Sequence, residues 1–452
     1  MDTTTLVALI IFAVTYICIF AFEKLRPYCA LISAAIFVIL GSIGVLSGYS
    51  YSFLDALKEI DWNVLMMIAG TMGTVQLFID SNMPSRMSDI LISKVSSTKM
   101  MIVVMSLFAG IISAFVDNVA TVLMIAPVAL AICKKLEISP VSTIICISIS
   151  SNLQGAATLV GDTTSILLAK AAGLDFSDFF VDDGRLGMFF VTEAGALVSA
   201  LIILWMFRKE NGKIDITDLT PVEDKVPTIL LILTVVCLIL VSFIPYKDAA
   251  AEGQFYKPDI TNGLICIFFF VIGLVRQCLK EKSVNPIKKA LPEIDYYTLG
   301  LLLGLFIVIG GIKKAGIIDL LANEIYSLCG GSTRTAVFVT FTVIVWMSVA
   351  ISAFIDNIPY VATMLPVVAA LSSHFIAGGV AMDPKLLYYG LLVGATLGGN
   401  ITPVGASANI AGIGILRKEG HTVKNGDFMK YSVPFTLAAV LTGYILLWII
   451  WM

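Results

Sequence analysis

The sequence predicts an all-α polytopic membrane protein built from two inverted repeats, each with a re-entrant helical hairpin and a broken transmembrane helix. Three observations predict this fold: the composition, a series of apolar segments and an internal repeat. Of the 452 residues, 58% are hydrophobic and 13% are charged, whereas soluble chains contain roughly 45–50% apolar and 25% charged residues. This composition excludes a water-soluble enzyme of this length. The net charge of -3 is also too small to suggest nucleic acid as a partner.

Ten segments are long and apolar enough to cross a bilayer, which takes about 20 residues of helix. They are 5–22, 29–46, 62–80, 141–170, 186–207, 226–244, 261–275, 296–312, 386–415 and 432–450. Two more apolar stretches, 100–133 and 335–373, are too long for one crossing and carry Asp-Asn near the middle. Each is predicted to be a hairpin that enters the bilayer and turns back, with its tip buried in protein or facing water.

The distribution of basic residues predicts the orientation of these segments. With the N-terminus outside, about two thirds of the 29 Lys and Arg residues fall in cytoplasmic loops, where such residues accumulate. The hairpin 100–133 then enters from the cytoplasm and the hairpin 335–373 from outside. We expect an integral protein of the plasma (inner) membrane with both termini outside.

Three motifs recur in the same order in the two halves of the chain. EIDW at 59–62 recurs as EIDY at 293–296, SAFVDN at 113–118 as SAFIDN at 352–357, and GAATLVG at 155–161 more loosely as GNITPVG at 399–405. An odd number of steps along the series of spans separates the copies, which predicts that the halves are inverted. Inverted repeats with broken helices around a central site are typical of secondary transporters.

The predicted domain organisation follows from this repeat. Residues 1–210 form the first repeat, with five spans and the hairpin 100–133. Residues 211–225 form a cytoplasmic linker. Residues 226–452 form the second, inverted repeat, with five spans and the hairpin 335–373.

Three aspartates fall inside apolar segments, where a carboxylate is costly unless it is protonated, cation-bound or hydrated. Asp117 and Asp356 occupy matched hairpin tips, whereas Asp162 has no acidic counterpart, because Ala406 stands at the matching position. A satisfied helix cap is the simple alternative for any one of them. Their duplication makes Asp117 and Asp356 the predicted proton or sodium carriers.

The segments 155–165 and 398–409 are predicted to break their helices, because Gly and Pro interrupt them, and to offer Thr, Ser, Asn and carbonyl oxygens to an ion. One predicted half-site contains Ser113, Asp117, Asn118, Thr158, Gly161 and Asp162, and the other contains Ser352, Asp356, Asn357, Asn400, Thr402, Ser407 and Asn409. Sodium is the one cofactor considered, at Asp117, Asn118, Asp356 and Asn357. The alternative is that the small residues only allow close helix packing.

The motifs SAFVDNVATVLMIAPV, GAATLVGDTTS, SAFIDNIPYVATMLPV and GGNITPVGASANI followed by RKEGH resemble the ion transporter superfamily. The similar branch contains arsenite permeases, citrate-transporter-like proteins, NhaD-type sodium/proton antiporters and the melanosomal P protein. The resemblance covers nearly the whole chain. It implies a homodimer in which each protomer has a scaffold domain and a transport domain that moves by an elevator mechanism. It also implies ion and substrate sites at both hairpin tips and both helix breaks.

Two departures from the family pattern affect the expected substrate. According to this resemblance, family members that carry dicarboxylates have Ser-Asn-Thr at the hairpin tips. This chain has Asp117-Asn118-Val119 and Asp356-Asn357-Ile358 there. Two carboxylates would repel a polyanion unless cations or protons neutralise them. The branch similar to the P protein has GDPPN at the first break, where this chain has GDTTS and lacks both prolines.

We therefore predict a sodium- or proton-coupled secondary active transporter that moves a small ion or anion by an elevator mechanism. Sodium/proton exchange of the NhaD type and anion movement such as arsenite efflux both remain open. No nucleotide-binding P-loop occurs, so direct ATP drive is not expected. A passive channel is a further alternative. An intramembrane aspartyl protease is disfavoured, because an enzyme has no reason to repeat SAFxDN on an inverted copy, and no enzymatic activity is expected.

Overall fold

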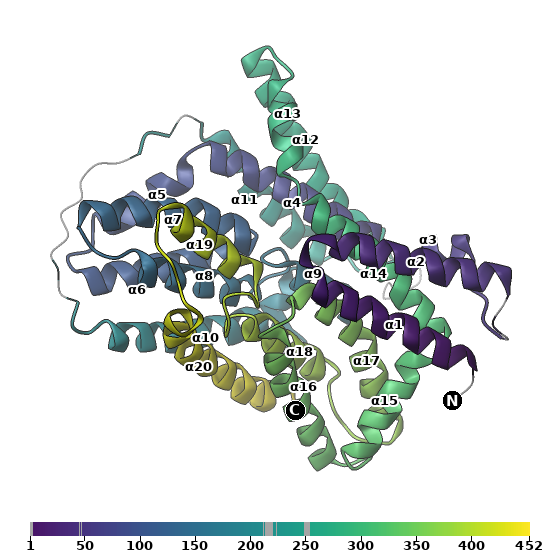
Figure 1. The fold of residues 1–452 in the computed structure, drawn as a ribbon. Helices are drawn as coiled ribbons and strands as arrows, with labels where there is room; N and C mark the ends of the chain where they lie inside the picture. The colour runs from purple at the N-terminus through teal and green to yellow at the C-terminus, as the bar shows by residue number, and fades with distance from the viewer. Residues whose placement is uncertain are drawn as a thin grey trace.

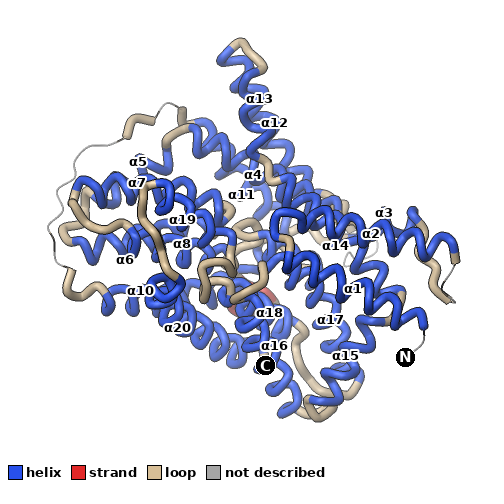
Figure 2. Tube along the Cα trace, viewed as in Figure 1, coloured by secondary structure: helices blue, strands red, loops and turns tan. Residues whose placement is uncertain are grey.

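The computed structural model describes residues 3–44, 46, 48–210, 212, 220–222, 224–247 and 254–452. These residues are helical apart from loops, three short 3-10 helices and one two-stranded hairpin (Figures 1 and 2). Most of the predicted linker 211–225 lies outside the described residues.

The described residues before the linker form ten α-helices: α1 (Thr3–Ala21), α2 (Arg26–Ile43), α3 (Phe53–Glu59), α4 (Trp62–Asp80), α5 (Met83–Ile92), α6 (Thr98–Ser113), α7 (Asn118–Lys135), α8 (Val141–Gly155), α9 (Thr163–Ala172) and α10 (Met188–Met206). The described residues after it form ten more: α11 (Val226–Ser242), α12 (Thr261–Glu281), α13 (Asn285–Ala290), α14 (Tyr296–Lys314), α15 (Ile317–Leu328), α16 (Arg334–Ser352), α17 (Asn357–Ala377), α18 (Lys385–Gly398), α19 (Ser407–Lys418) and α20 (Asn425–Trp451). The remaining elements are η1 (Glu23–Leu25), η2 (Ser177–Phe179), η4 (Leu291–Glu293), β1 (Val181–Asp182) and β2 (Arg185–Leu186).

All ten predicted spans coincide with helices, and ten of the described helices are long and apolar enough to cross a membrane. The two sets of ten differ in membership. The hairpin arms α7, α16 and α17 meet the length criterion, whereas α11, with 17 residues, does not. The spans predicted over 141–170 and 386–415 are each two helices, α8 with α9 and α18 with α19, so the predicted helix breaks are confirmed.

Four helices were not predicted, namely α3, α5, α13 and α15. Each is short. Helices α5 and α15 are also amphipathic, with one apolar and one polar face, so their sequences do not form a continuous apolar run. A search for spanning segments overlooks such amphipathic helices because their mean hydropathy is low or their length is insufficient. All four lie beside α4 or α14. Helix α5 connects α4 to α6 and α15 connects α14 to α16, whereas α3 connects α2 to α4 and α13 connects α12 to α14.

The helices pack as two groups. We call α1, α2, α4, α11, α12 and α14 the first helix group, and α6 to α10 with α16 to α20 the second helix group. In Figure 1 the first group lies along the upper and right part of the molecule, and much of the second fills the left and lower centre. The groups meet where α4 and α14 contact α7, α9 and α17.

Close pairs of helices hold the first group together. Helix α4 packs along α12, and α2 packs along α14. At the α4 contact, a Cβ added to Gly70 would lie 2.4 Å from the carbonyl carbon of Cys266, and one added to Gly304 in α14 would lie 2.7 Å from that of Ala30. Small residues allow this backbone approach, which favours helix packing in a bilayer. Each pair joins a helix from one half of the chain to a helix from the other.

The centre of the second group is formed by α8 and α18. In α8 every residue from Thr143 to Gly155 is buried, and in α18 every residue from Leu386 to Gly398 is buried. Helices buried on all sides occupy the core of a bundle. Helices α6, α7 and α20 pack around α8, and α16, α17 and α20 pack around α18.

Each predicted hairpin is two helices joined by a short turn that ends in an aspartate. Asp117 is the N-cap of α7, and its carboxylate accepts hydrogen bonds from the backbone N–H groups of Val119 at 3.0 Å and Ala120 at 3.1 Å. Asp356 is the N-cap of α17 and accepts one from Ile358 at 3.2 Å. Aspartate is a preferred N-cap because its oxygens satisfy free N–H groups of the first turn. The two tips are therefore built in the same way.

The strands β1 and β2 form a small hairpin against the start of α18. The ammonium of Lys385 contacts Asp182 at 2.6 Å and Asp183 at 2.9 Å. Its hydrogen bond holds the pKa of the exposed Asp183 carboxyl below the usual value, whereas burial raises the pKa of Asp182. All three residues belong to the second helix group, so this contact joins the β1–β2 hairpin to α18 within that group.

Candidate ion site between the helix groups

A cavity of about 430 Å³ lies where the two helix groups meet. Its wall is formed by Met72, Gln76, Ile79, Asp117, Asn118, Val119, Ala120, Leu123, Met124, Asn152, Asp162, Thr163, Glu293, Asp295, Thr298, Asn357, Ile358 and Ser407. Helices α4 and α14 supply one side, and both hairpins and both helix breaks supply the other. Glu293 is exposed, so the cavity reaches the protein surface.

The charge on this wall is acidic. Asp117, Asp162, Glu293 and Asp295 line the cavity, and its described lining contains no Lys or Arg. Asp162 is 4% exposed, so its carboxyl is almost fully removed from bulk water. A low-dielectric site with several carboxylates favours a cation or a proton and disfavours an uncompensated anion.

Helix starts position the two carboxylates that face each other across the groups. Asp117 caps α7, and Asp295 caps α14 by accepting from the Thr298 backbone N–H at 2.9 Å and from its hydroxyl at 2.5 Å. These aspartates hold fixed positions because their side chains bond to the first turn of their own helices. Asp117 also keeps oxygen lone pairs available to a ligand, since a carboxylate accepts about four hydrogen bonds.

Asp162 joins the first helix break to the second hairpin. The hydroxyl of Thr164 donates to its Oδ2 at 2.6 Å, and the amide of Asn357 donates to the same oxygen at 3.5 Å. Thr164 also contacts the hydroxyl of Thr396 in α18 at 3.0 Å. The carboxylate therefore lies among groups from α9, α17 and α18.

A chain of amides crosses the centre of the second group beside the cavity. Asn118 donates to Oδ1 of Asn152 at 2.9 Å. Asn152 donates to the carbonyl of Thr396 at 2.7 Å and to Oδ1 of Asn400 at 3.1 Å. Asn400 donates onward to the carbonyl of Ile149 at 2.8 Å. These contacts connect the first hairpin tip to the second helix break.

The predicted site residues fall into two sets. Five line the cavity together, and they come from both predicted half-sites: Asp117, Asn118, Asp162, Asn357 and Ser407. The other eight lie outside its lining: Ser113, Thr158, Gly161, Ser352, Asp356, Asn400, Thr402 and Asn409. The two half-sites are thus interleaved around one cavity rather than separate.

Several residues of the second set tie hairpins to helix breaks. The Thr158 hydroxyl donates to the carbonyl of Ala114, and the Thr402 hydroxyl donates to the carbonyl of Ala353. These are matching positions of the two repeated motifs. A Cβ on Gly161 would lie 2.7 Å from the Ser113 carbonyl oxygen, so only glycine fits this close approach of the break to the hairpin.

The remaining members of that set are buried in the core. Ser352 donates to the carbonyl of Ala395 at 2.5 Å, whereas the hydroxyl of its counterpart Ser113 has no protein partner. Asn409 donates to the carbonyls of Gly399 at 3.1 Å and Thr402 at 3.2 Å, and its own Oδ1 is unpartnered. These contacts stabilise the irregular segment between α18 and α19.

Asp356 forms an ion pair with Arg26 instead of facing the cavity. The two side chains are 2.9 Å apart and are 13% and 12% exposed. Arg26 begins α2 in the first helix group, so this pair joins the second hairpin tip to that group. The matched aspartates therefore differ: Asp356 has a cationic partner, whereas the ion pairs of the described residues do not include Asp117.

No cluster of three or more His, Cys, Asp or Glu side chains suited to a metal ion occurs within the ranges that the structure describes. The four cavity carboxylates are thus spread around the wall. A sodium ion at Asp117 and Asn118 would need carbonyl, amide and hydroxyl oxygens as additional ligands, and both helix breaks supply such groups.

Sequence reasoning missed several polar residues of this region. Glu293 and Asp295 belong to the repeated EIDW/EIDY motif, which was used only as evidence of duplication. Asn152 and Thr396 each lie one turn before a helix break, and Asn152 is one of two amide side chains in the segment 141–155, which has no charged residue. The repetition of an acidic motif could have identified Asp295. That Asp295 lies at the same cavity as Asp117 and Asp162, from the other half of the chain, is evident only from the structure.

A second cavity of about 450 Å³ lies between the groups near the first turn of α4. Val64, Lys170, Lys313, Asp319 and Tyr388 are part of its lining, which is otherwise mainly apolar. Its lining contains neither hairpin tip nor Asp162. The tips are therefore reached from the cavity at the far end of α4 and not from this one.

Comparison with known proteins gives concordant results. The family model described as citrate transporter matches residues 7–394. An uncharacterized transporter of Mycobacterium bovis is 30% identical over 450 residues, which are 98% of each chain. The human P protein is 24% identical over 478 residues, which cover 89% of this chain and 56% of the P protein.

Two solved structures have a similar fold. The YdaH transporter of Alcanivorax borkumensis superposes with a TM-score of 0.57 at 16% identity, over 99% of this chain and 98% of YdaH. MtrF of Neisseria gonorrhoeae superposes with a TM-score of 0.54 at 16% identity, over 93% and 94% of the two chains. These structures confirm the predicted all-α polytopic fold, and the family model and the relatives confirm the resemblance to the ion transporter superfamily.

Proposed function

Because the chain belongs to the citrate transporter family and is a membrane transporter, we propose that it is a cation-coupled secondary transporter whose coupling ion, sodium or a proton, binds at Asp117 and Asp162. The observation that carries the proposal is the acidic cavity. Its described lining contains four carboxylates and no Lys or Arg, and it includes residues of both hairpin tips and both helix breaks. Sodium/proton exchange is the simplest activity of such a site.

The packing supports transport by movement of one helix group against the other. Both hairpins and both breaks belong to the second group, and the ties from Thr158 and Thr402 hold each tip to its own break. The site can thus travel as a unit. We propose that it does so by an elevator mechanism, in which the first group is the scaffold and the two halves of the chain are inverted repeats.

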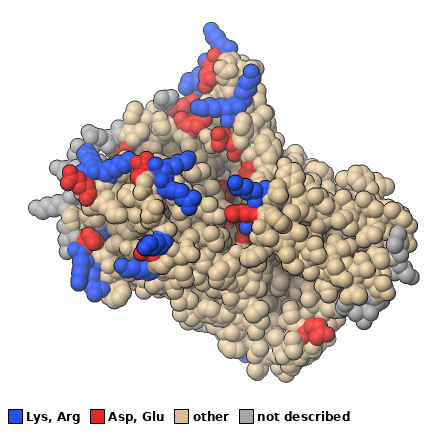
Figure 3. Space-filling model, viewed as in Figure 1, with Lys and Arg blue, Asp and Glu red and all other residues tan. Residues whose placement is uncertain are grey.

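The charged surface supports the proposed orientation in the plasma membrane. Figure 3 shows Lys and Arg gathered over the upper and left part of one face, whereas its lower right part is almost free of charge. Basic residues accumulate on the cytoplasmic side. The acidic cavity, which reaches the surface at Glu293 beside the basic helix α13, would then open to the cytoplasm, with both termini outside. We further propose a homodimer.

Ion binding can be tested on the purified protein without any assumption about transport. A bound ligand raises stability by RT ln(1 + [L]/Kd), or about 2.7 kcal/mol at one hundred times Kd. We expect the melting temperature to rise with sodium or with falling pH at constant ionic strength, using choline as the inert cation. The rise should be lost in Asp162→Asn. A melting temperature indifferent to both ions would contradict the proposed site.

A second candidate function is the transport of citrate together with a cation. The cavity has the size of a small-molecule site, for which about 300–1,000 Å³ is usual. Helices α9 and α19 begin at its wall with Thr163 and Ser407, and neither helix has a side-chain cap. Such helix starts favour a carboxylate, while Asp117 and Asp162 would hold the cation.

This candidate makes a different prediction from simple cation exchange. Free citrate would be repelled by the four carboxylates, so its uptake into proteoliposomes should require a divalent cation such as magnesium. Uptake of labelled citrate that is equal with and without the divalent cation would contradict this candidate. It would leave the test of sodium and proton binding unaffected.

A further inference from the structure

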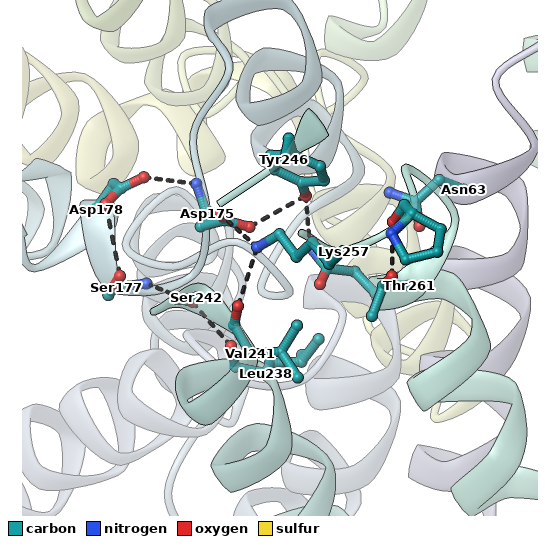
Figure 4. A network of polar contacts seen from close by, with 12 residues as sticks. Asn63, Asp175, Ser177, Asp178, Leu238, Val241, Ser242, Tyr246, Lys257 and Thr261 are labelled. Atoms are coloured by element: carbon teal, nitrogen blue, oxygen red, sulfur yellow. Dashed lines mark hydrogen bonds and ion pairs between the residues drawn. The ribbon is translucent and has the colours of Figure 1, made fainter. Parts of the chain in front are cut away.

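A buried ion pair lies far from the acidic cavity. The ammonium of Lys257 is 2.6 Å from a carboxylate oxygen of Asp175, and the two side chains are 2% and 10% exposed. Lys257 also donates to the carbonyl of Val241 at 3.1 Å, and its Nζ lies 4.2 Å from the centre of the Tyr246 ring. Figure 4 shows the lysine extended between these groups.

Both carboxylate oxygens of Asp175 accept hydrogen bonds. The hydroxyl of Tyr246 donates to the second oxygen of Asp175 at 3.1 Å, and Asn262 donates to that hydroxyl at 3.4 Å. Removing one member of such a pair leaves a buried charge without compensation, which is far more costly than losing an exposed pair. The conformation that contains the contact is therefore strongly favoured over one in which a single charge stays buried.

The pair joins the two helix groups. Asp175 follows α9, in the loop that leads to α10 of the second group, whereas Lys257 lies in the loop between α11 and α12 of the first. Lys170 of α9 and Asp61 at the start of α4 form another contact between the groups, at 3.5 Å. By contrast, Lys385 with Asp182 lies within one group.

Both contacts lie at the end of the molecule opposite the acidic cavity. Asn63, in the first turn of α4, accepts a hydrogen bond from the Gly263 N–H at 2.7 Å, next to Asn262 of the network. Gln76 of the same helix lines the acidic cavity. The thirteen residue steps from Asn63 to Gln76 correspond to about 20 Å of helix. Two ion pairs thus join the groups at this end of α4, whereas at the other end the groups line the acidic cavity and Arg26 with Asp356 joins the second hairpin tip to α2.

We propose that Asp175 and Lys257 form a latch that holds the two groups together at the α9 end of their boundary, near the second cavity, and so stabilises the state in which the acidic cavity is open. This inference rests on the proposed movement of one group against the other. Movement toward the alternative state must separate the pair and return both charges to water. The latch therefore sets the balance between the two states without touching the transported ion.

Paired cysteine reporters test the latch in the full-length protein in membranes. Gln76→Cys reports on the acidic cavity, and Val64→Cys, which is buried beside the second cavity, reports on the opposite end. Labelling with a small permeant maleimide, read by mass spectrometry, separates each reporter from the native cysteines. In Lys257→Met we expect labelling at position 64 to rise and labelling at position 76 to fall, so that their ratio changes about tenfold or more. The reason is that the Asp175 carboxylate, left buried without its partner, disfavours the state in which the two groups are held together at the α9 end.

The matched control is Lys385→Met, which removes a similar lysine-aspartate pair inside the second helix group and should leave the ratio unchanged. Labelling that rises at both reporters in Lys257→Met would mean only a loosened fold and would overturn the latch. An unchanged ratio would overturn it as well. Cysteine labelling needs no ion gradient, so it tests the latch independently of ion coupling. A failure of ion coupling would instead appear as a lack of sodium and proton binding by the unaltered protein.

Discussion

Two aspartates that occupy equivalent positions in the repeated motifs have different electrostatic surroundings. Asp356 is paired with Arg26 at 2.9 Å, whereas Asp117 accepts only backbone N–H groups and faces the acidic cavity. A carboxylate already neutralised by an arginine has little affinity for a second cation, while one without such a partner retains it. The sequence predicted equal roles for the two tips, and the structure assigns them different surroundings because Arg26 comes from a distant helix.

Asp117→Asn tests the role of the unpaired aspartate. Asparagine also caps helices well, so α7 should remain folded and the melting temperature without sodium should change little. Hydrogen bonds to a charged group contribute about 1.5–3 kcal/mol, so the affinity for the coupling ion should fall roughly tenfold to a hundredfold. Asp183→Asn, at an exposed carboxylate outside the cavity, is the control. Equal ion affinity in Asp117→Asn and in the unaltered protein would remove Asp117 from the site.

Arg26 and Asp356 are expected to be coupled in stability. Arg26→Gln leaves the carboxylate of Asp356 without its partner, so it should be more destabilising than Arg26→Gln combined with Asp356→Asn. Thermal unfolding of the two single variants and the double variant gives the interaction energy, and values for contacting residues are about 0.5–3 kcal/mol. Additive effects would show that the pair contributes nothing to stability.

At the scale of elements, most of the helices followed from hydropathy and from the breaks at Gly and Pro. The spans, both hairpins and both interruptions could be predicted because each depends on a local run of residues. The helices α5 and α15 could not, because their apolar faces are completed by neighbours distant in sequence. The same limit applies to the site: Asp117 and Asp162 were predicted, whereas Asp295 enters it only through the packing of α14.

Glycine substitutions test the tight approach of each hairpin tip to its helix break. A Cβ at Gly161 would lie 2.7 Å from the carbonyl oxygen of Ser113, and one at Gly405 would lie 2.8 Å from that of Ala353. Gly161→Ala and Gly405→Ala should therefore each lower the free energy of unfolding by about 1–3 kcal/mol, the usual cost of overpacking. The measurement is the melting temperature of the purified protein.

Gly414→Ala provides the matched control in helix α19. A Cβ there meets nothing within 4 Å, and alanine favours a helix over glycine by about 1 kcal/mol. We expect unchanged or slightly raised stability. If all three alanine variants behaved alike, the close contact between tips and breaks would not contribute to the fold.

The orientation of the whole molecule decides whether the acidic cavity opens to the cytoplasm or to the outside. Two native cysteines report on this without any substitution. Cys278 lies near the end of α12 beside basic residues, and Cys329 follows α15, in a loop that we expect to be outside. An impermeant maleimide added to intact cells should label Cys329 and spare Cys278.

Cys329→Ser is the control for that assignment, since its labelling from outside should disappear. Labelling of Cys278 in intact cells, with Cys329 protected, would reverse the orientation of the protein. The acidic cavity would then open to the outside, and the latch at Asp175 and Lys257 would hold the groups together at the cytoplasmic end. The chemistry of the ion site would be unchanged, but the state that the latch stabilises would be the outward-facing one instead of the inward-facing one.

Gradient-driven flux in proteoliposomes shows whether the protein couples sodium movement to proton movement through Asp117 and Asp162. An imposed sodium gradient should drive proton movement, followed with a pH-sensitive dye, in the unaltered protein and in Asp183→Asn. The double variant Asp117→Asn with Asp162→Asn should show no flux above that of empty liposomes, because the cavity would lose the two buried carboxylates that bind the ion. Equal flux in the double variant and the unaltered protein would contradict cation coupling at this site.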